Sequence, residues 1–244
     1  MIVNRFSHLP LVVKNLMIVN GLFFLATWSL QSRGIDLTNW FALHQFQSTH
    51  FQPHQLVTHM FMHGNFTHLF FNMFTLWMFG KTLENKWGPK RFLIYYMITG
   101  LGAALIYIIY LQFQINILSS SIDSNSYQIL LRDGKNILNN YQNYTDINLG
   151  KLNLLINTPM VGASGAVYGL LLAFGILFPN SVIYLYFAIP VKIKYFVTGI
   201  GILSLISGIS NSPDDNVAHF AHLGGMIFGI LLLMFWKKKG EISF

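Results

Sequence analysis

The chain has 244 residues, of which 53% are hydrophobic and only 9% are charged, whereas roughly one quarter of the residues in a soluble domain are charged. This composition excludes an ordinary water-soluble enzyme, and the absence of cysteine excludes disulfides and thiolate chemistry. The formal net charge of +7 would suit a nucleic-acid-binding protein, but the placement of the basic residues favours a different explanation.

Six apolar runs approach the roughly 20 residues that a helix needs to cross a bilayer. We expect spans at about Leu11–Leu30, Phe66–Gly80, Phe92–Phe113, Val161–Phe178, Tyr195–Ile209 and Val217–Trp236. The residues before the first run are polar and the run itself is long, so we expect it to remain as a span rather than to be a cleaved signal peptide. The predicted fold is an all-α polytopic bundle of six transmembrane helices, with residues 1–244 as a single membrane domain.

The basic residues predict how this bundle is oriented. Eleven of the 15 Lys and Arg residues fall before or early in the first span, in the 2/3 and 4/5 connections, or after the sixth span. Cytoplasmic loops carry an excess of Lys and Arg, so we expect both termini in the cytoplasm. The positive charge therefore indicates orientation in a lipid bilayer, and we expect no nucleic-acid partner.

Two external segments have different characters. Residues 31–65 are rich in aromatic side chains and histidine, so we expect short interfacial helices with Trp40, Phe41, Phe46 and Phe51 at headgroup depth. The connection at about 114–159 is rich in Asn, Ser and Tyr. It buries little apolar area on composition, so we expect an external loop in which part can form an amphipathic helix.

Polar side chains are rare in the spans, and four of them fall at a similar depth. With the orientation above, spans two, four and six enter from outside, which puts His68, Asn72, Ser164 and His222 one or two turns below the external surface. A serine becomes a nucleophile when a histidine takes its proton. No carboxylate lies at this depth, since Glu84 falls at the cytoplasmic end of span two, so we predict a Ser–His dyad without an acid.

The same residues suggest how an oxyanion is stabilised. The N-terminus of span four supplies free backbone N–H groups, and His68 and Asn72, four residues apart on one helical face, can add side-chain donors. Gly162 lets a substrate backbone approach Ser164. Contact between Ser164 and His222 requires two helices to touch nearly backbone to backbone, which the small residues Gly225 and Gly229 beside His222 allow.

Each of these features has an ordinary structural explanation when taken alone. A serine in a membrane helix usually bonds a nearby carbonyl, a GxxxG pattern usually serves helix packing, and His68 with Asn72 can be a structural polar pair. His59 and His63 are expected to hold structure or water rather than to catalyse. Only the combination at one depth favours a hydrolase.

Three stretches resemble the signatures of the rhomboid intramembrane serine proteases: "HGNFTHLFFNMFTLWMFG", "GASGAVYG" and "AHFAHLGGMIFG". The resemblance implies that Ser164 is the nucleophile, that His222 is the general base, and that His68 and Asn72 are oxyanion donors, with Tyr168 stacked beside His222. It also implies cleavage of single-span membrane substrates near the outer face, with small residues favoured at the cut, and no cofactor or metal. The Asn- and Lys-rich six-span chain most resembles a bacterial inner-membrane member.

Two departures and two rival functions accompany this resemblance. The Trp-Arg pair of some members is absent, because Phe41 follows Trp40, and the Asn-rich connection is not part of the minimal family core. A metal transporter or metalloenzyme is suggested by His59/His63 and His219/His222, although no HExxH motif or buried carboxylate accompanies them. A rhomboid-like pseudoenzyme that binds membrane helices is the second rival, but such proteins usually lack the serine or the histidine, and both are present here.

Overall fold

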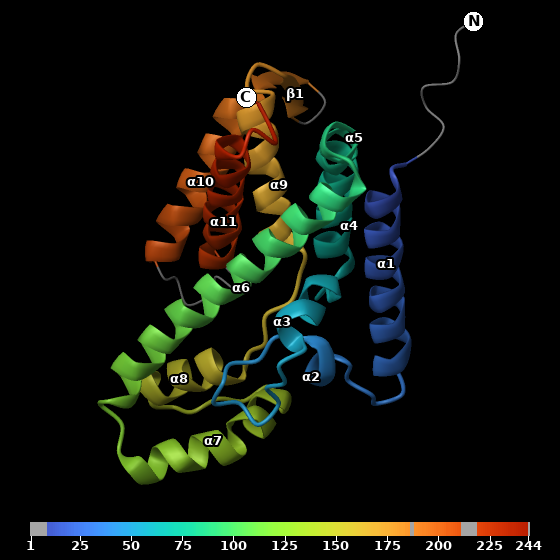
Figure 1. Cartoon of the computed structure of the whole chain (residues 1–244). Helices are drawn as coiled ribbons and strands as arrows, with labels where there is room; N and C mark the ends of the chain where they lie inside the picture. The colour runs from blue at the N-terminus through green and yellow to red at the C-terminus, as the bar shows by residue number, and fades with distance from the viewer. Residues whose placement is uncertain (1–8, 186–187, 211–218, 244) are drawn as a thin grey trace, which may run out of the picture.

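The computed structural model describes residues 9–185, 188–210 and 219–243, most of which are helical (Figure 1). The elements are α1 Leu11–Gln31, α2 Thr38–Phe41, α3 Gln55–Thr58, the 3₁₀ turn η1 His59–Phe61, α4 Phe66–Thr75, the π-helical turn η2 Leu76–Gly80, α5 Lys81–Trp87, α6 Pro89–Ser119, α7 Ser124–Asn139, α8 Ile147–Asn157, α9 Ser164–Leu177, β1 Val182–Leu185, β2 Ile189–Lys192, α10 Ile193–Ser210 and α11 His219–Lys238.

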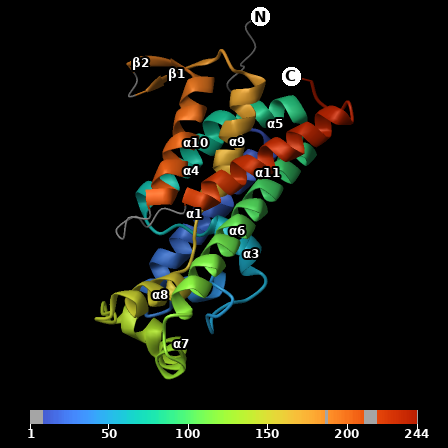
Figure 2. The same cartoon turned by 90° about the vertical axis from the view of Figure 1, so that its left-hand side faces the viewer.

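The long helix α6 crosses the molecule diagonally, and α9 and α11 pack against it and against each other (Figures 1 and 2). Helix α10 packs on α11 and α9, whereas α1 lies beside α4 and η2. The main core is filled from α6 by Tyr95 and Tyr96 and from α9 by Ala166 and Leu170, all almost fully buried. Helices α4, α9 and α11 all begin on the side of the molecule where α2, α3 and α8 lie (Figure 1), so their N-terminal turns face the same end.

The six expected spans all coincide with helices, but with different lengths. Three of the described helices, α1, α6 and α11, are long and apolar enough to cross a membrane. Helices α9 and α10 are apolar but shorter, and the second expected span is a continuous α–π–α rod formed by α4, η2 and α5. The fold is mostly helical, as predicted, while the count of six spans and their orientation stay predictions. The first two residues of the sixth expected span, Val217 and Ala218, lie outside the described residues.

The Asn-rich connection forms two helices, which corrects the expectation of a loop over most of its length. Leu130 of α7 and Leu152 and Ile156 of α8 are buried against Ile115, near the C-terminal end of α6. These few apolar side chains form one small core. The average composition of the segment is polar and does not reveal this core.

The asparagines of this segment also fasten α7 to α8. Nδ2 of Asn153 donates to the Gly134 carbonyl at 3.1 Å, and Nδ2 of Asn157 donates to Oδ1 of Asn153 at 2.8 Å. Asn153 and Asn157 are both buried, so these side chains stabilise a helix pair rather than a solvated loop. In both views α7 and α8 lie at the opposite end of the molecule from the β1–β2 hairpin (Figures 1 and 2).

Residues 31–65 contain the short helices that we expected. Trp40 and Phe46 are exposed, while the ring of Phe41 packs edge-on against Phe23 of α1. An isolated bridge joins this segment to the chain before α9: the backbones of Leu43 and Met160 exchange two hydrogen bonds of 2.9 and 2.8 Å. The bridge fixes the path of the strand-like segment that leads to Ser164.

Glu84 is the one acid that we expected beside a span. It is buried in α5, at the C-terminal end of the rod that α4, η2 and α5 form. Its two carboxylate oxygens accept hydrogen bonds from the backbone N–H groups of Val12 and Val13, at 2.9 and 2.8 Å. The first turn of a helix has N–H groups without intrahelical partners, so Glu84 caps α1 from a distant part of the sequence.

Candidate active site

Ser164 is the first residue of α9, and the turn before it depends on glycine. Gly162 has φ +122°, and a Cβ placed there would lie 2.7 Å from both Cε1 and Nε2 of the His68 ring. Its N–H donates to the His59 carbonyl at 2.9 Å. The turn is therefore held between residues 31–65 and α4, with the His68 ring against the backbone beside Ser164.

Ser164 and His222 form a hydrogen-bonded pair. Oγ of Ser164 and Nε2 of His222 lie 2.9 Å apart, although 58 residues separate them in sequence. His222 lies near the start of α11 and is 7% exposed. The ring of Tyr168, one turn into α9, stacks on the imidazole with centroids 4.0 Å apart and planes 7° apart, so the imidazole is held in one orientation.

Glycines allow the backbones of α9 and α11 to touch beside this pair. A Cβ on Gly225 would collide with the carbonyl oxygen of Gly165, and one on Gly165 would collide with Ala103 of α6. The close approach predicted from Gly225 is confirmed. Gly229 instead leaves room for the hydroxyl of Tyr95, which donates to the Gly169 carbonyl at 2.9 Å.

His68 and Asn72 belong to a second polar group next to Gly162. The imidazoles of His63 and His68 have centroids 5.0 Å apart. Nδ2 of Asn72 donates to Nε2 of His63 at 3.0 Å, and both side chains are buried. The structure thus brings together Ser164, His222, Tyr168, Gly162 and His68, and it connects Asn72 to them through His63.

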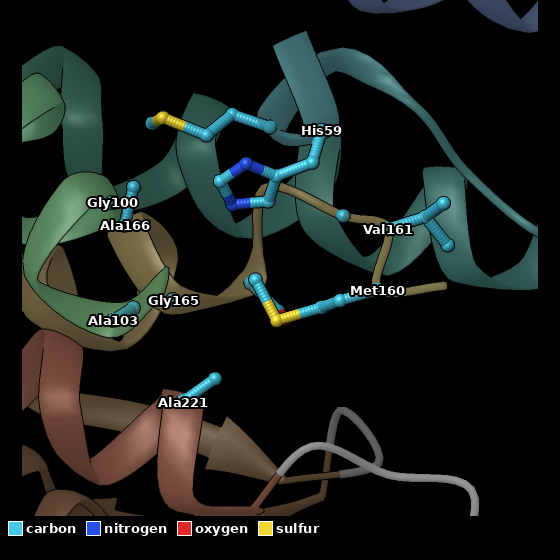
Figure 3. Close-up of a pocket in the computed structure, with 11 residues that line it drawn as sticks. His59, Gly100, Ala103, Met160, Val161, Gly165, Ala166 and Ala221 are labelled. Carbon is cyan, nitrogen blue, oxygen red and sulfur yellow. The ribbon is translucent and has the colours of Figure 1, made fainter. Parts of the chain in front are cut away.

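A small pocket opens beside the serine (Figure 3). Glycine, alanine, methionine and valine form most of its lining, which consists of His59, Met60, Gly100, Ala103, Met160, Val161, Gly162, Ser164, Gly165, Ala166 and Ala221. The imidazole of His59 points toward its interior (Figure 3). The space beside the serine is therefore small and largely apolar.

His59 contributes more to the site than the sequence analysis predicts. Its Nδ1 lies 2.8 Å from the Gln55 carbonyl, its own carbonyl holds Gly162, and burial lowers its pKa to about 4. The expected structural role is therefore accompanied by a place in the pocket wall. The sequence does not predict the contact of His59 with Gly162, because this contact depends on the path of an irregular segment.

The histidine pairs do not form a metal site in the part of the chain that the structure describes. No group of three or more His, Cys, Asp or Glu side chains comes together there. His219 and His222 have ring centroids 6.3 Å apart, and His222 is directed at a serine hydroxyl. The metal hypothesis gains no support from this arrangement.

Comparisons with known proteins agree with the three sequence signatures. The family model described as "Rhomboid domain" matches residues 50–239. The chain is 28% identical over 239 residues to "RHOMBOID-like protein 12, mitochondrial" of Arabidopsis thaliana, covering 96% of this chain and 60% of that protein. It is 29% identical over 186 residues to "Rhomboid protease AarA" of Providencia stuartii (71% and 52% covered) and 26% identical over 189 residues to "Putative rhomboid protease YdcA" of Bacillus subtilis (77% and 69% covered).

Proposed function

Because the chain belongs to the rhomboid family, which includes intramembrane serine proteases, we propose that it is a serine endopeptidase that cleaves single-span membrane proteins near the outer face of the membrane. The observation that carries this proposal is the 2.9 Å contact between Oγ of Ser164 and Nε2 of His222. As a family member with several long apolar helices it is an integral membrane protein.

The proposed reaction uses His222 as base and then as acid. Nε2 of His222 accepts the Ser164 proton while Oγ attacks the carbonyl carbon of the scissile peptide bond. The C–N bond then breaks, the imidazolium gives its proton to the leaving amine, and the acyl group stays on Ser164 as an ester. Water hydrolyses this ester in a second step, in which His222 again takes a proton and returns one to Ser164.

The negative oxygen of each tetrahedral intermediate needs donors at the site where its charge develops. We assign this role to backbone N–H groups at the start of α9, together with the side chains of His68 and Asn72. Support comes from the His68 ring, which lies against Gly162 directly before the serine turn. Tyr168 orients the imidazole of His222 by stacking on it, and the absence of a side chain at Gly162 leaves room for the His68 ring beside the serine turn.

The substrate is expected to carry a small residue at the cut. Ala103, Gly165, Ala166 and Ala221 keep the pocket beside Ser164 narrow. A transmembrane substrate helix must also unwind locally before its peptide bond reaches Ser164, because helical backbone groups are bonded to one another. We therefore propose single-span membrane proteins as partners, with the lipid bilayer as the medium.

The membrane arrangement is part of this proposal. We propose six spans with both termini in the cytoplasm, which agrees with three long apolar helices, two shorter ones and the distribution of Lys and Arg. The relatives described above include a mitochondrial protein of Arabidopsis thaliana as well as proteins from bacteria, so they do not support the bacterial inner membrane in particular, which we expected.

Cleavage by the purified full chain tests the proposal. Reconstituted protein is incubated with a panel of single-span reporters, and the cut sites are read by mass spectrometry. We expect Ser164→Ala and His222→Ala each to abolish cleavage, whereas Ser204→Ala, which removes another buried hydroxyl in α10, should remain active. A fluorophosphonate should label Ser164 in the wild type.

The second candidate function is that of a pseudoenzyme that only binds membrane helices. It would be favoured by intact folding and reporter binding with neither cleavage nor fluorophosphonate labelling. Persistent cleavage by folded Ser164→Ala would instead show that another nucleophile acts.

A further inference from the structure

The amide of Asn72 has its orientation set by a residue outside α4. Nδ2 of Asn72 donates to Nε2 of His63 at 3.0 Å, and Asn72 is only 5% exposed. An amide nitrogen can donate but not accept, so Nε2 of His63 is the acceptor. A neutral imidazole that accepts at Nε2 carries its proton on Nδ1. The contact thus fixes both the amide orientation and the tautomer.

His63 is well suited to remain this acceptor. It lies between η1 and α4, is 4% exposed, and packs against the His68 ring. Burial lowers the pKa of His63 to about 3, the neighbouring His68 adds to the decrease, and the Phe61 backbone opposes it. Near neutral pH the ring is therefore uncharged, and the lone pair on Nε2 is available.

The two hydrogens of the Asn72 amide then have different roles. One is taken by His63, and the other is left on the same nitrogen to donate elsewhere. Without an acceptor, the last torsion of asparagine is broad and roughly two-fold, so the amide can turn its oxygen toward the substrate. An oxygen facing a developing oxyanion repels it, whereas an N–H stabilises it.

We propose that His63 is a positioning residue that holds the Asn72 amide with an N–H directed to the oxyanion. The inference rests on the proposed function, since it assigns His63 a role in the same acyl transfer. His63 itself touches neither Ser164 nor His222 among the hydrogen bonds and ring contacts described above. It acts through Asn72, and its effect belongs to the transition state rather than to substrate binding.

Two amide substitutions separate this role from a general structural one. The oxygen of His63→Gln can reach the position of Nε2, whereas the shorter side chain of His63→Asn reaches only the position of Nδ1. We expect His63→Asn to lower kcat about ten-fold or more with little change in KM, and His63→Gln to recover most of the loss. Equal rates in the two folded variants would overturn the proposal.

A double-mutant cycle with Asn72→Ala measures whether His63 works through Asn72. In the Asn72→Ala background, His63→Asn should cause no further loss of kcat. His44→Asn is the matched control, because His44 is also a buried histidine of the external segment, with its Nε2 3.3 Å from the Thr38 carbonyl. Its effect on rate should be the same with and without Asn72. Independent, multiplicative losses from His63→Asn and Asn72→Ala would contradict the inference.

Fluorophosphonate labelling and thermal unfolding accompany each measurement. If Ser164→Ala still cleaves, the proposed function itself fails. If Ser164 is essential but His63 and Asn72 act independently, only the positioning role fails. Should His63→Asn not fold, His63→Gln alone in the cycle decides: it must retain most of the activity in the presence of Asn72 and show no separate effect in its absence.

Discussion

At the scale of single residues, α11 contains two histidines, His219 and His222, and either is a candidate for the proposed base. The ring of His222 reaches Ser164, whereas His219 is the first residue of the helix and its ring centroid lies 6.3 Å from that of His222. We expect His222→Ala to be as inactive as Ser164→Ala, while His219→Ala keeps measurable activity against the same reporter. A dead His219→Ala beside an active His222→Ala would show that the base has been assigned to the wrong residue.

Gly162 is the residue at which the backbone itself is most constrained. Its φ of +122° is unfavourable for any side chain, and a Cβ would press on the His68 ring. A strained backbone of this kind costs on the order of 1–3 kcal/mol. We expect Gly162→Ala to lower both the unfolding temperature and the rate.

The control for this prediction is Gly21→Ala in α1, where a Cβ meets nothing within 4 Å. Alanine is favoured over glycine in a helix by roughly 0.5–1 kcal/mol, so this variant should be as stable as the wild type or more so, with unchanged cleavage. Equal behaviour of the two variants would mean that the turn before Ser164 tolerates a side chain.

At the scale of elements, the contact between α9 and α11 sets the distance between Ser164 and His222, the proposed nucleophile and base. A methyl group on Gly225 meets the Gly165 carbonyl, which is backbone and cannot rotate away. We expect Gly225→Ala to separate the helices and to reduce kcat by about 10² or more, since misplacement by about 1 Å has effects of this size. Gly199→Ala in α10, with open space around its Cβ, should leave the rate unchanged.

The cap on α1 acts on stability rather than on chemistry. Removing the Glu84 carboxylate leaves the N–H groups of Val12 and Val13 without these acceptors, and each unsatisfied buried donor costs about 1–3 kcal/mol. We expect Glu84→Ala to unfold at a lower temperature but to cleave normally while folded. Glu241→Ala removes a partly exposed ion pair with Arg91, which is worth at most about 1 kcal/mol, so its unfolding temperature should change little.

The elements differ in how well the sequence predicts them. Helix α1 begins at Leu11 as expected and ends one residue later, at Gln31, because an uninterrupted apolar run is a strong signal. The sequence predicts a helix in only part of the segment that forms α7 and α8, because asparagine favours loops, whereas Asn153 and Asn157 bond across a buried interface.

The site residues also differ in how well the sequence predicts them. The sequence predicts that Ser164 and His222 lie at a similar depth, since both are near the starts of helices that run in the same direction. The contacts of His59 with Gly162 and of His63 with Asn72 come from η1 and from the irregular backbone between η1 and α4. Its course is decided by tertiary hydrogen bonds rather than by periodicity, so the sequence could not predict them.

At the scale of the whole molecule, the cysteine-free chain allows its orientation to be measured directly. Tyr141 is fully exposed between α7 and α8, and Lys90 is exposed at the start of α6. We expect a membrane-impermeant maleimide applied from outside to label Tyr141→Cys but not Lys90→Cys unless the membrane is opened. The reverse pattern would invert the proposed topology, and with it the outer-face cleavage.

The 58-residue separation between Ser164 and His222 also has a consequence in time. At a synthesis rate of about 5–20 residues per second, the ribosome needs roughly 3–12 s to add the base after it has added the nucleophile. During that interval the serine lacks its proton acceptor, and it stays inert until α11 docks on α9. The protease that we propose therefore cannot cleave the other membrane proteins that are being inserted nearby until its own assembly is finished.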